Sequence, residues 1–186
     1  MSTNNQTDIS IVCFGKQCIA KSTYRIYDIE KPAMTCGQYY NDIIDTIDTE
    51  FVLLCNSDTI AYTESCIKYA IHIMNTMPLV HYVYGDVHID SPTPYSLFLP
   101  SYEPNLSQTY QLQNFNLPFI VRTRYAPTFN PQIKYLSLQD GLLQLFNTCF
   151  GWHIPETMFR LIWGNNINHK LLAACIQNDM KLLPTT

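Results

Sequence analysis

The feature that most constrains this chain is an apolar run at residues 51–55, which ends in the polar turn Asn56-Ser57-Asp58. A continuous apolar run with polar flanks is typical of a parallel strand that is covered on both faces. In open α/β sheets, ligands bind outside the carboxyl ends of such strands. The run therefore predicts a central strand, with the Asn56 amide and the Asp58 carboxylate at the ligand-binding edge of the sheet.

The segments around this run alternate between strand and helix patterns, which indicates an α/β domain with a mostly parallel sheet flanked by helices. Thr35 is expected to cap the first helix. Residues 91–116 are rich in Pro, Ser, Tyr, Asn and Gln and predict a long loop, with or without a short hairpin. The predicted strands are Ile9–Phe14, 24–29, 51–55, 81–87, Phe119–Arg122 and 159–163, with 152–155 extended, and the predicted helices are 37–47, 64–75, 140–149 and 169–181.

Length and composition fit one globular domain. The 186 residues are enough to bury a core without disulfide or metal cross-links. A composition of 47% apolar and 14% charged residues excludes wholesale disorder.

The net charge is −4 and the basic residues do not cluster, so nucleic-acid binding is not expected. No apolar stretch reaches the roughly 18 residues of a membrane span, and the polar N-terminus does not resemble a signal peptide, so a cytoplasmic location is expected.

The cysteines do not form a recognisable framework. Their number is 7, which is odd, and no Cys-x-x-Cys pair occurs. Reduced, mostly buried thiols are therefore expected, and a zinc site is the alternative.

Short motifs along residues 8–170 share their order and spacing with one family. They are Gly37-Gln-Tyr-Tyr-Asn41, the 50–58 segment, Val83-Tyr-Gly-Asp86, Pro118-Phe-Ile-Val-Arg122, Phe129-Asn130-Pro131, Leu138-Gln139-Asp140 and Phe159-Arg-Leu-Ile-Trp-Gly-Asn-Asn166. In this order they resemble the family 2 glycosyltransferases of the GT-A fold. The resemblance implies a single GT-A-like domain over residues 1–186, with a core at about 8–170 and a C-terminal helix at about 169–181.

The chain departs from the family pattern mainly by replacing charged residues. The gap of about ten residues between the first two strands leaves no room for the family's first helix, and the trimmed size is similar to that of small viral glycosyltransferases, which would act in the host cytoplasm. The replaced positions are Asn56 for the first Asp of Asp-x-Asp, Asn130 for the Asp of Phe-Asp-Pro, Gln139 for the Glu of x-Glu-Asp, Tyr40 for the Arg of Arg-Asn, and Trp163 for a metal-binding His, with His169 six residues further on.

The resemblance implies transfer of a sugar from a nucleotide-diphosphate donor to a hydroxyl acceptor on a glycan, protein or lipid, with inversion. A divalent cation, Mn²⁺ or Mg²⁺, neutralises the diphosphate leaving group and prefers oxygen ligands. Asp58 is the candidate metal ligand, Asn56 adds a neutral amide oxygen, and His169 is a candidate third ligand. For Asp58, the alternative role is an Asx turn that closes the strand.

Asp140 is the candidate general base, which takes the proton from the acceptor hydroxyl. Its place at a helix N-terminus is expected to lower its pKa and keep it ionised, and simple helix capping is the alternative. Asp28 and Asn41 are candidate contacts to the donor nucleotide or sugar; as alternatives, each is a solvated residue.

Residues outside this set have mainly structural roles in the sequence-based interpretation. Asp86 is expected to be structural, and Trp152 and His153 either stack on an acceptor sugar or fill the core. Two other functions stay open: a degenerate GT-A domain that binds a nucleotide or partner without turnover, and an unrelated doubly wound interaction domain. A homodimer is compatible with either.

Overall fold

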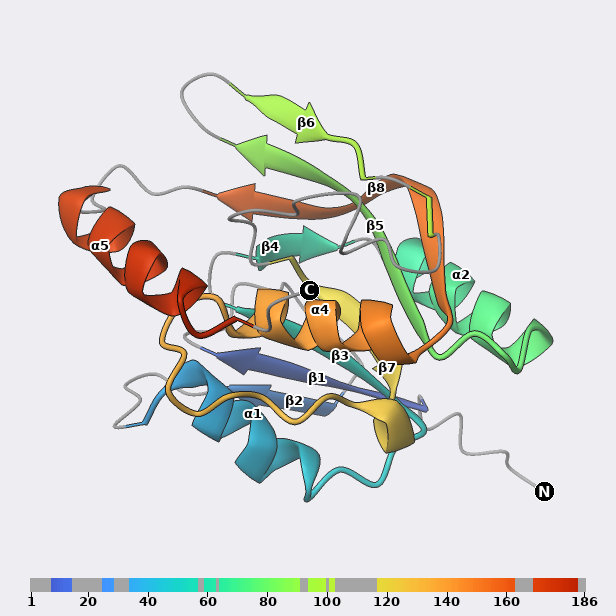
Figure 1. Cartoon of the computed structure of the whole chain (residues 1–186). Coiled ribbons are helices and arrows are strands. Elements are labelled where there is room, and N and C mark those ends of the chain that lie inside the picture. The colour runs from blue at the N-terminus through green and yellow to red at the C-terminus, as the bar shows by residue number, and fades with distance from the viewer. Residues whose placement is uncertain are drawn as a thin grey trace.

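The computed structural model describes residues 8–14, 25–28, 34–56, 59–62, 64–90, 94–99, 101–102, 117–162 and 169–183. Within these residues, one sheet has the strand order β2-β1-β3-β7-β5-β8-β4, and β6 pairs with β5 beside this path (Figure 1). The strands are β1 (Ile9–Phe14), β2 (Arg25–Asp28), β3 (Phe51–Asn56), β4 (Thr59–Tyr62), β5 (Tyr82–Asp90), β6 (Tyr95–Leu97), β7 (Phe119–Arg122) and β8 (Gly151–Ile162), and the helices are α1 (Cys36–Ile44), α2 (Glu64–Thr76), the 3₁₀ turn η1 (Thr123–Tyr125), α4 (Ser137–Thr148) and α5 (His169–Met180).

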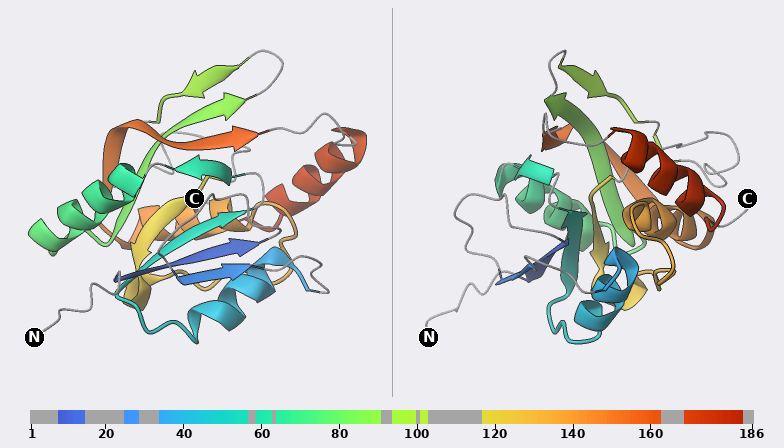
Figure 2. Two further views of the ribbon diagram at one scale, coloured as in Figure 1. Left: turned by 180° about the vertical axis from the view of Figure 1, so that it is seen from behind. Right: turned by 90° about the vertical axis from the view of Figure 1, so that its left-hand side faces the viewer.

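Most strands run in one direction, as the sequence predicts. β1 is parallel to β2 and β3, and β5 is parallel to β8, while β7 lies antiparallel between β3 and β5. Figure 2 shows α1, α4 and α5 on one face of the sheet and α2 on the other. None of the described helices is both long and apolar enough to cross a membrane.

The centre of the core is the pair of strands β1 and β3. All six residues of β3 are buried, and its register with β1 pairs Ile11 with Leu53. Helix α1 covers the face beside β1 and begins with a capping box, in which Thr35 and Gln38 satisfy each other's backbone amides, so the predicted cap is confirmed. None of the described cysteines forms a disulfide, and Cys13, Cys36 and Cys55 are buried in this core.

Several predicted boundaries are wrong. Helix α4 begins at Ser137, not at residue 140, and β8 is one strand across both segments predicted at 152–155 and 159–163. β8 accommodates Pro155 because its register with β5 jumps from Ile154 to Thr157, which frees the proline from the ladder. The predicted loop at 91–116 contains β6, which forms a hairpin with β5, and β4 has no counterpart among the predicted strands.

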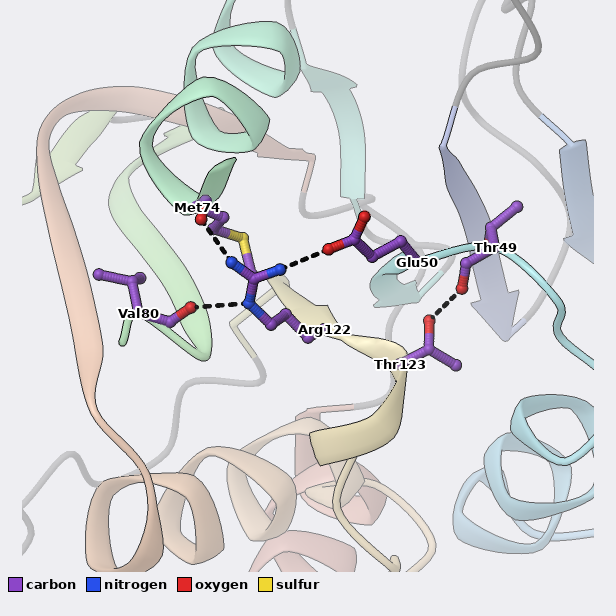
Figure 3. A network of polar contacts seen from close by, with 6 residues as sticks. All are labelled: Thr49, Glu50, Met74, Val80, Arg122 and Thr123. Carbon is purple, nitrogen blue, oxygen red and sulfur yellow. Dashed lines mark hydrogen bonds and ion pairs between the residues drawn. The ribbon is translucent and has the colours of Figure 1, made fainter. Parts of the chain in front are cut away.

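A buried arginine stabilises the edge of the sheet where the parallel strands β3 and β5 begin, which is opposite the edge formed by their carboxyl ends (Figure 3). Arg122 is 6% exposed, and its guanidinium donates to the carbonyl oxygen of Val80 at 3.1 Å and to that of Met74. It also pairs with the Glu50 carboxylate at 2.5 Å and lies 5.3 Å from the centre of the Phe51 ring. One side chain thus joins the end of α2, the turn before β5 and the start of β3.

The substitution Arg122→Met should lower the free energy of unfolding by about 2–4 kcal/mol, because two buried carbonyls lose their donor. Urea unfolding measures this change. The matched control is Arg124→Met, since Arg124 is exposed and its guanidinium rests over the Tyr125 ring; its effect should stay within about 0.5 kcal/mol. Similar losses for both variants would contradict the role of the Arg122 network.

Candidate functional site

The carboxyl edge of the parallel strands brings two predicted site residues together. In the register of β1 with its neighbours, Cys13 pairs with Asp28 of β2, and Phe14 pairs with Asn56 of β3. Asp28 and Asn56 therefore flank the end of β1, about 10 Å apart, since neighbouring strands are about 4.8 Å apart. Asn56 is buried, with 7% exposed. Asp58 lies outside the described residues, as do the side chains of Asp28 and His169.

Tyr40 stabilises the end of β3. In the sequence analysis this residue was noted only because it replaces the Arg of the family's Arg-Asn motif. The Tyr40 hydroxyl donates to the carbonyl oxygen of Cys55 at 2.7 Å, directly before Asn56. Tyr40 is fully buried, and burial raises its pKa well above the usual range, so it stays a neutral donor. Its ring packs against the Phe129 ring at 4.9 Å between centroids. Tyr40 thus connects the ligand edge to the loop before α4.

Asn41 holds that loop through its main chain. Its side-chain nitrogen donates to the carbonyl oxygen of Phe129 at 2.9 Å, and its side-chain oxygen accepts from the Phe129 amide at 2.9 Å. This two-way pair uses both ends of the carboxamide. The structure therefore gives Asn41 a positioning role, and its contact with a donor nucleotide stays a prediction.

Asp140 lies in the first turn of α4, next to this loop. One carboxylate oxygen accepts from the backbone amide of Asn130 at 2.8 Å, and the residue is 2% exposed. Leu136 occupies the N-cap, so the alternative that Asp140 caps the helix is wrong.

The predicted pKa direction of Asp140 is also wrong. Burial raises its pKa above the ordinary value of 3.8, and hydrogen bonds from the Asn130 amide and Gln144 offset only part of this effect. The helix-dipole argument applies to a solvated carboxylate, and here desolvation is larger. A carboxylate with a raised pKa is a stronger proton acceptor than a solvated one.

The sequence-based analysis missed Asp179, in the last turn of α5. Its carboxylate accepts from the backbone amides of Lys134, Tyr135 and Leu136, at 3.1, 2.5 and 3.0 Å, in the segment that leads into α4. The sequence did contain an indication of this role. An acidic residue in the last turn of a helix interacts unfavourably with the helix dipole, so a hydrogen-bond donor from another segment is expected beside it.

Asp86 is buried in β5 and accepts from the Leu99 amide at 2.8 Å and from Nε2 of His153 at 2.9 Å. These bonds fit the structural role that the sequence predicts for it. His153 faces Tyr84 in the sheet, at 5.2 Å between ring centroids, so it is part of a packed layer and not of the carboxyl edge.

The described side chains include no group of three His, Cys, Asp or Glu that could hold a metal ion. Of the predicted ligands, Asn56 is the one with a described side chain, and its amide oxygen is a donor that Mg²⁺ and Mn²⁺ accept. The role of Asn56 as an oxygen ligand of a divalent cation stays a prediction.

Comparison with known proteins finds similarity in structure and not in sequence. No family model matches the chain, and no curated protein does. The crystal structure of S. aureus TarS 1–349 matches with a TM-score of 0.59 and 12% identity, over 83% of this chain and 60% of that one. Glucosyl-3-phosphoglycerate synthase from Mycobacterium tuberculosis, in complex with Mg²⁺ and UDP, matches with a TM-score of 0.56 and 12% identity, over 92% of this chain and 76% of that one.

A further structure of the same synthase, with Mn²⁺, UDP-glucose and phosphoglyceric acid, matches with a TM-score of 0.58 and 13% identity, over 94% of this chain and 78% of that one. These neighbours are GT-A glycosyltransferases, and the likeness shows a GT-A fold. At such identities it establishes the fold alone. The chain spans less than two thirds of the TarS chain.

The substitution Tyr40→Phe should lower the free energy of unfolding by about 1–2 kcal/mol, because the Cys55 carbonyl loses its donor while the ring packing is kept. Denaturant unfolding measures the loss. Tyr69→Phe is the control, since Tyr69 is 51% exposed on α2, and no measurable change is expected for it. Equal losses in the two variants would contradict the Tyr40 bond.

The substitution Asp140→Asn should stabilise the fold increasingly as the pH rises. A raised pKa means that the folded state binds the proton more tightly than the unfolded chain, so wild-type stability declines as the pH rises above the ordinary value of 3.8. Asparagine has no such proton and still accepts from Asn130. The difference in free energy of unfolding between variant and wild type should therefore grow as the pH rises above 3.8 and level off once the pH exceeds the raised pKa. A difference that does not change with pH would exclude the raised pKa.

Proposed function

We propose that this chain transfers a sugar from a nucleotide-diphosphate donor to a hydroxyl acceptor, with inversion and with the help of Mg²⁺ or Mn²⁺. The observation that carries the proposal is Asp140, a buried carboxylate of raised pKa beside the loop that adjoins the carboxyl edge. The motif order, which resembles family 2, and the GT-A fold support it.

The donor is proposed to bind at the carboxyl edge of β1, β2 and β3, as ligands do in open α/β sheets. Structural neighbours were crystallised with UDP or UDP-glucose and Mg²⁺ or Mn²⁺, which supports a uridine nucleotide as the first donor to test. Asn56 and Asp58 would hold the cation, with His169 as a third ligand, and Asp28 would contact the nucleotide. When bound, the cation supplies charge neutralisation for the leaving diphosphate.

Asp140 would accept the proton of the acceptor hydroxyl as that oxygen attacks the anomeric carbon of the sugar. The Asn130 amide holds one carboxylate oxygen and fixes its direction. Because burial disfavours the ionised form, the carboxylate gains more from taking up a proton than a solvated one. The transfer rate should therefore rise with pH through the raised pKa of Asp140.

A second candidate function is a degenerate GT-A domain that binds a nucleotide without turnover. The observation that favours it is that the described contacts of Asn41 and Asp140 are bonds within the chain, to Phe129 and Asn130. Structural roles alone account for such bonds. Amides at positions 56, 130 and 139, where the family has acids, point the same way.

The first test is a thermal-shift screen against UDP-, GDP- and dTDP-sugars, with and without Mn²⁺. Stabilisation by one nucleotide that requires Mn²⁺ and is lost in Asp58→Ala is the expected result. If no nucleotide stabilises the protein, both the transferase and the degenerate domain are excluded.

The second test separates transfer from binding. Asp140→Asn should lower donor hydrolysis or transfer by about 10²–10⁴-fold while keeping the nucleotide-dependent thermal shift. Asp42→Asn is the control, because Asp42 is exposed on α1 beside Asn41, and it should keep full activity. Nucleotide binding in the wild type without hydrolysis or transfer would favour the degenerate domain.

A further inference from the structure

A pocket of about 260 Å³ lies away from the carboxyl edge, where α4 ends and β8 begins. Asp140 is at the other end of α4, eight residues before Thr148, or about 12 Å by helix rise. Among the described residues, its walls are formed by Ser101, Tyr102, Phe150, Gly151, Trp152 and His153. For Trp152 and His153, stacking on an acceptor sugar was one of the two predicted roles.

The polar group of this pocket is a histidine with a fixed orientation. The side chains of His153 and Asp86 are each 6% exposed, and Nε2 of His153 lies 2.9 Å from the Asp86 carboxylate. That carboxylate also accepts from the Leu99 amide. A carboxylate only accepts, so Nε2 carries a proton in this pair. None of the described residues forms a hydrogen bond with Nδ1.

Nδ1 of His153 restricts which chemical groups of a ligand can bind in this pocket. In the neutral imidazole Nδ1 is an acceptor, and in the charged imidazolium it is a donor. A hydroxyl group fits both states, because it donates to the first and accepts from the second. The described residues of the pocket walls include no Arg or Lys for a phosphate, and the Asp86 carboxylate beside His153 already accepts from two donors.

The remaining walls are aromatic and partly open to water. Phe150 is 42% exposed. Trp152 precedes His153 in β8, so its side chain points to the opposite face of the sheet and its main chain borders the pocket. Tyr102 meets Phe150 edge to face at 5.0 Å, and its hydroxyl already donates to the Cys149 carbonyl, so it offers the pocket its ring. Aromatic walls with a single oriented polar group are typical of a ligand pocket, and this volume fits one small ring.

We infer that this pocket binds a single neutral sugar ring, with the apolar face of the ring against the aromatic walls and a hydroxyl on Nδ1 of His153. The inference goes beyond the proposed transfer reaction and does not depend on it. The site binds a sugar whether or not the carboxyl edge binds a nucleotide.

The experiment is an NMR titration of the full chain that follows the His153 imidazole and Gly151 amide signals. The probes are methyl β-D-glucoside, methyl α-D-mannoside and N-acetylglucosamine, with uridine and glycerol as comparison ligands. We expect at least one sugar to shift both signals saturably, while glycerol, which lacks a ring, does not. Phe150→Ala should weaken that sugar at least tenfold, and Phe98→Ala, which removes a 77% exposed aromatic outside the pocket, should leave it unchanged.

Three results would overturn the inference: no saturable shift with any of the sugars, tighter binding of uridine than of every sugar, or equal affinities in the Phe150→Ala variant and the wild type. His153→Gln supplies a second readout, because loss of Nδ1 should weaken the sugar even where the aromatic walls are intact. Asp140→Asn should bind the sugar like the wild type, so a failed transfer assay does not affect this test.

Discussion

The placement of Asp140 depends on a pair of hydrogen bonds between Asn41 and the backbone of Phe129. Asn41 is on α1, which follows the second strand, and Phe129 is in the loop before α4, 88 residues further along the chain. Without this pair, the loop that presents the Asn130 amide to Asp140 would be joined to the N-terminal half mainly by the Tyr40–Phe129 ring packing and by the bond from the Thr35 hydroxyl to the Pro131 carbonyl. The adjacent Tyr40 extends the same connection to the end of β3, so consecutive residues of one helix serve both halves of the candidate site.

At the other edge of the sheet, where β3 and β5 begin, a buried charge holds the segments together. There Arg122 gathers carbonyl oxygens from two segments and a carboxylate from a third, and its charge is spread over several acceptors. A buried cation is tolerable only with such partners.

The elements that depend on local pattern were predictable. The apolar run of β3 and the Thr35 cap follow from periodicity and capping chemistry within a few residues. The predicted start of α4 is too late, because Asp140 was expected at the helix N-terminus, with capping as an alternative role, and its actual environment comes from a loop that folds over it. Likewise the pKa of Asp140 could not be read from its position in a helix, because desolvation is a property of tertiary packing. The partners of Asp179 and His153 are also distant in sequence, at separations of 43 to 45 and 67 residues.

The hydrogen bonds that hold the loop before α4 go almost wholly to its main chain. Asn41 contacts the amide and carbonyl of Phe129, Thr35 donates to the carbonyl of Pro131, and Asp179 accepts only backbone amides. Main-chain atoms are the same whatever the side chain. The exposed positions of the loop can therefore change during evolution while its course over Asp140 is preserved. The residues that bond its main chain, and the buried Phe129 and Ile133, cannot change so freely. Asn130 is an instance: its side-chain oxygen accepts from the Gln132 amide as an aspartate would, so exchange of acid and amide there leaves the backbone path intact.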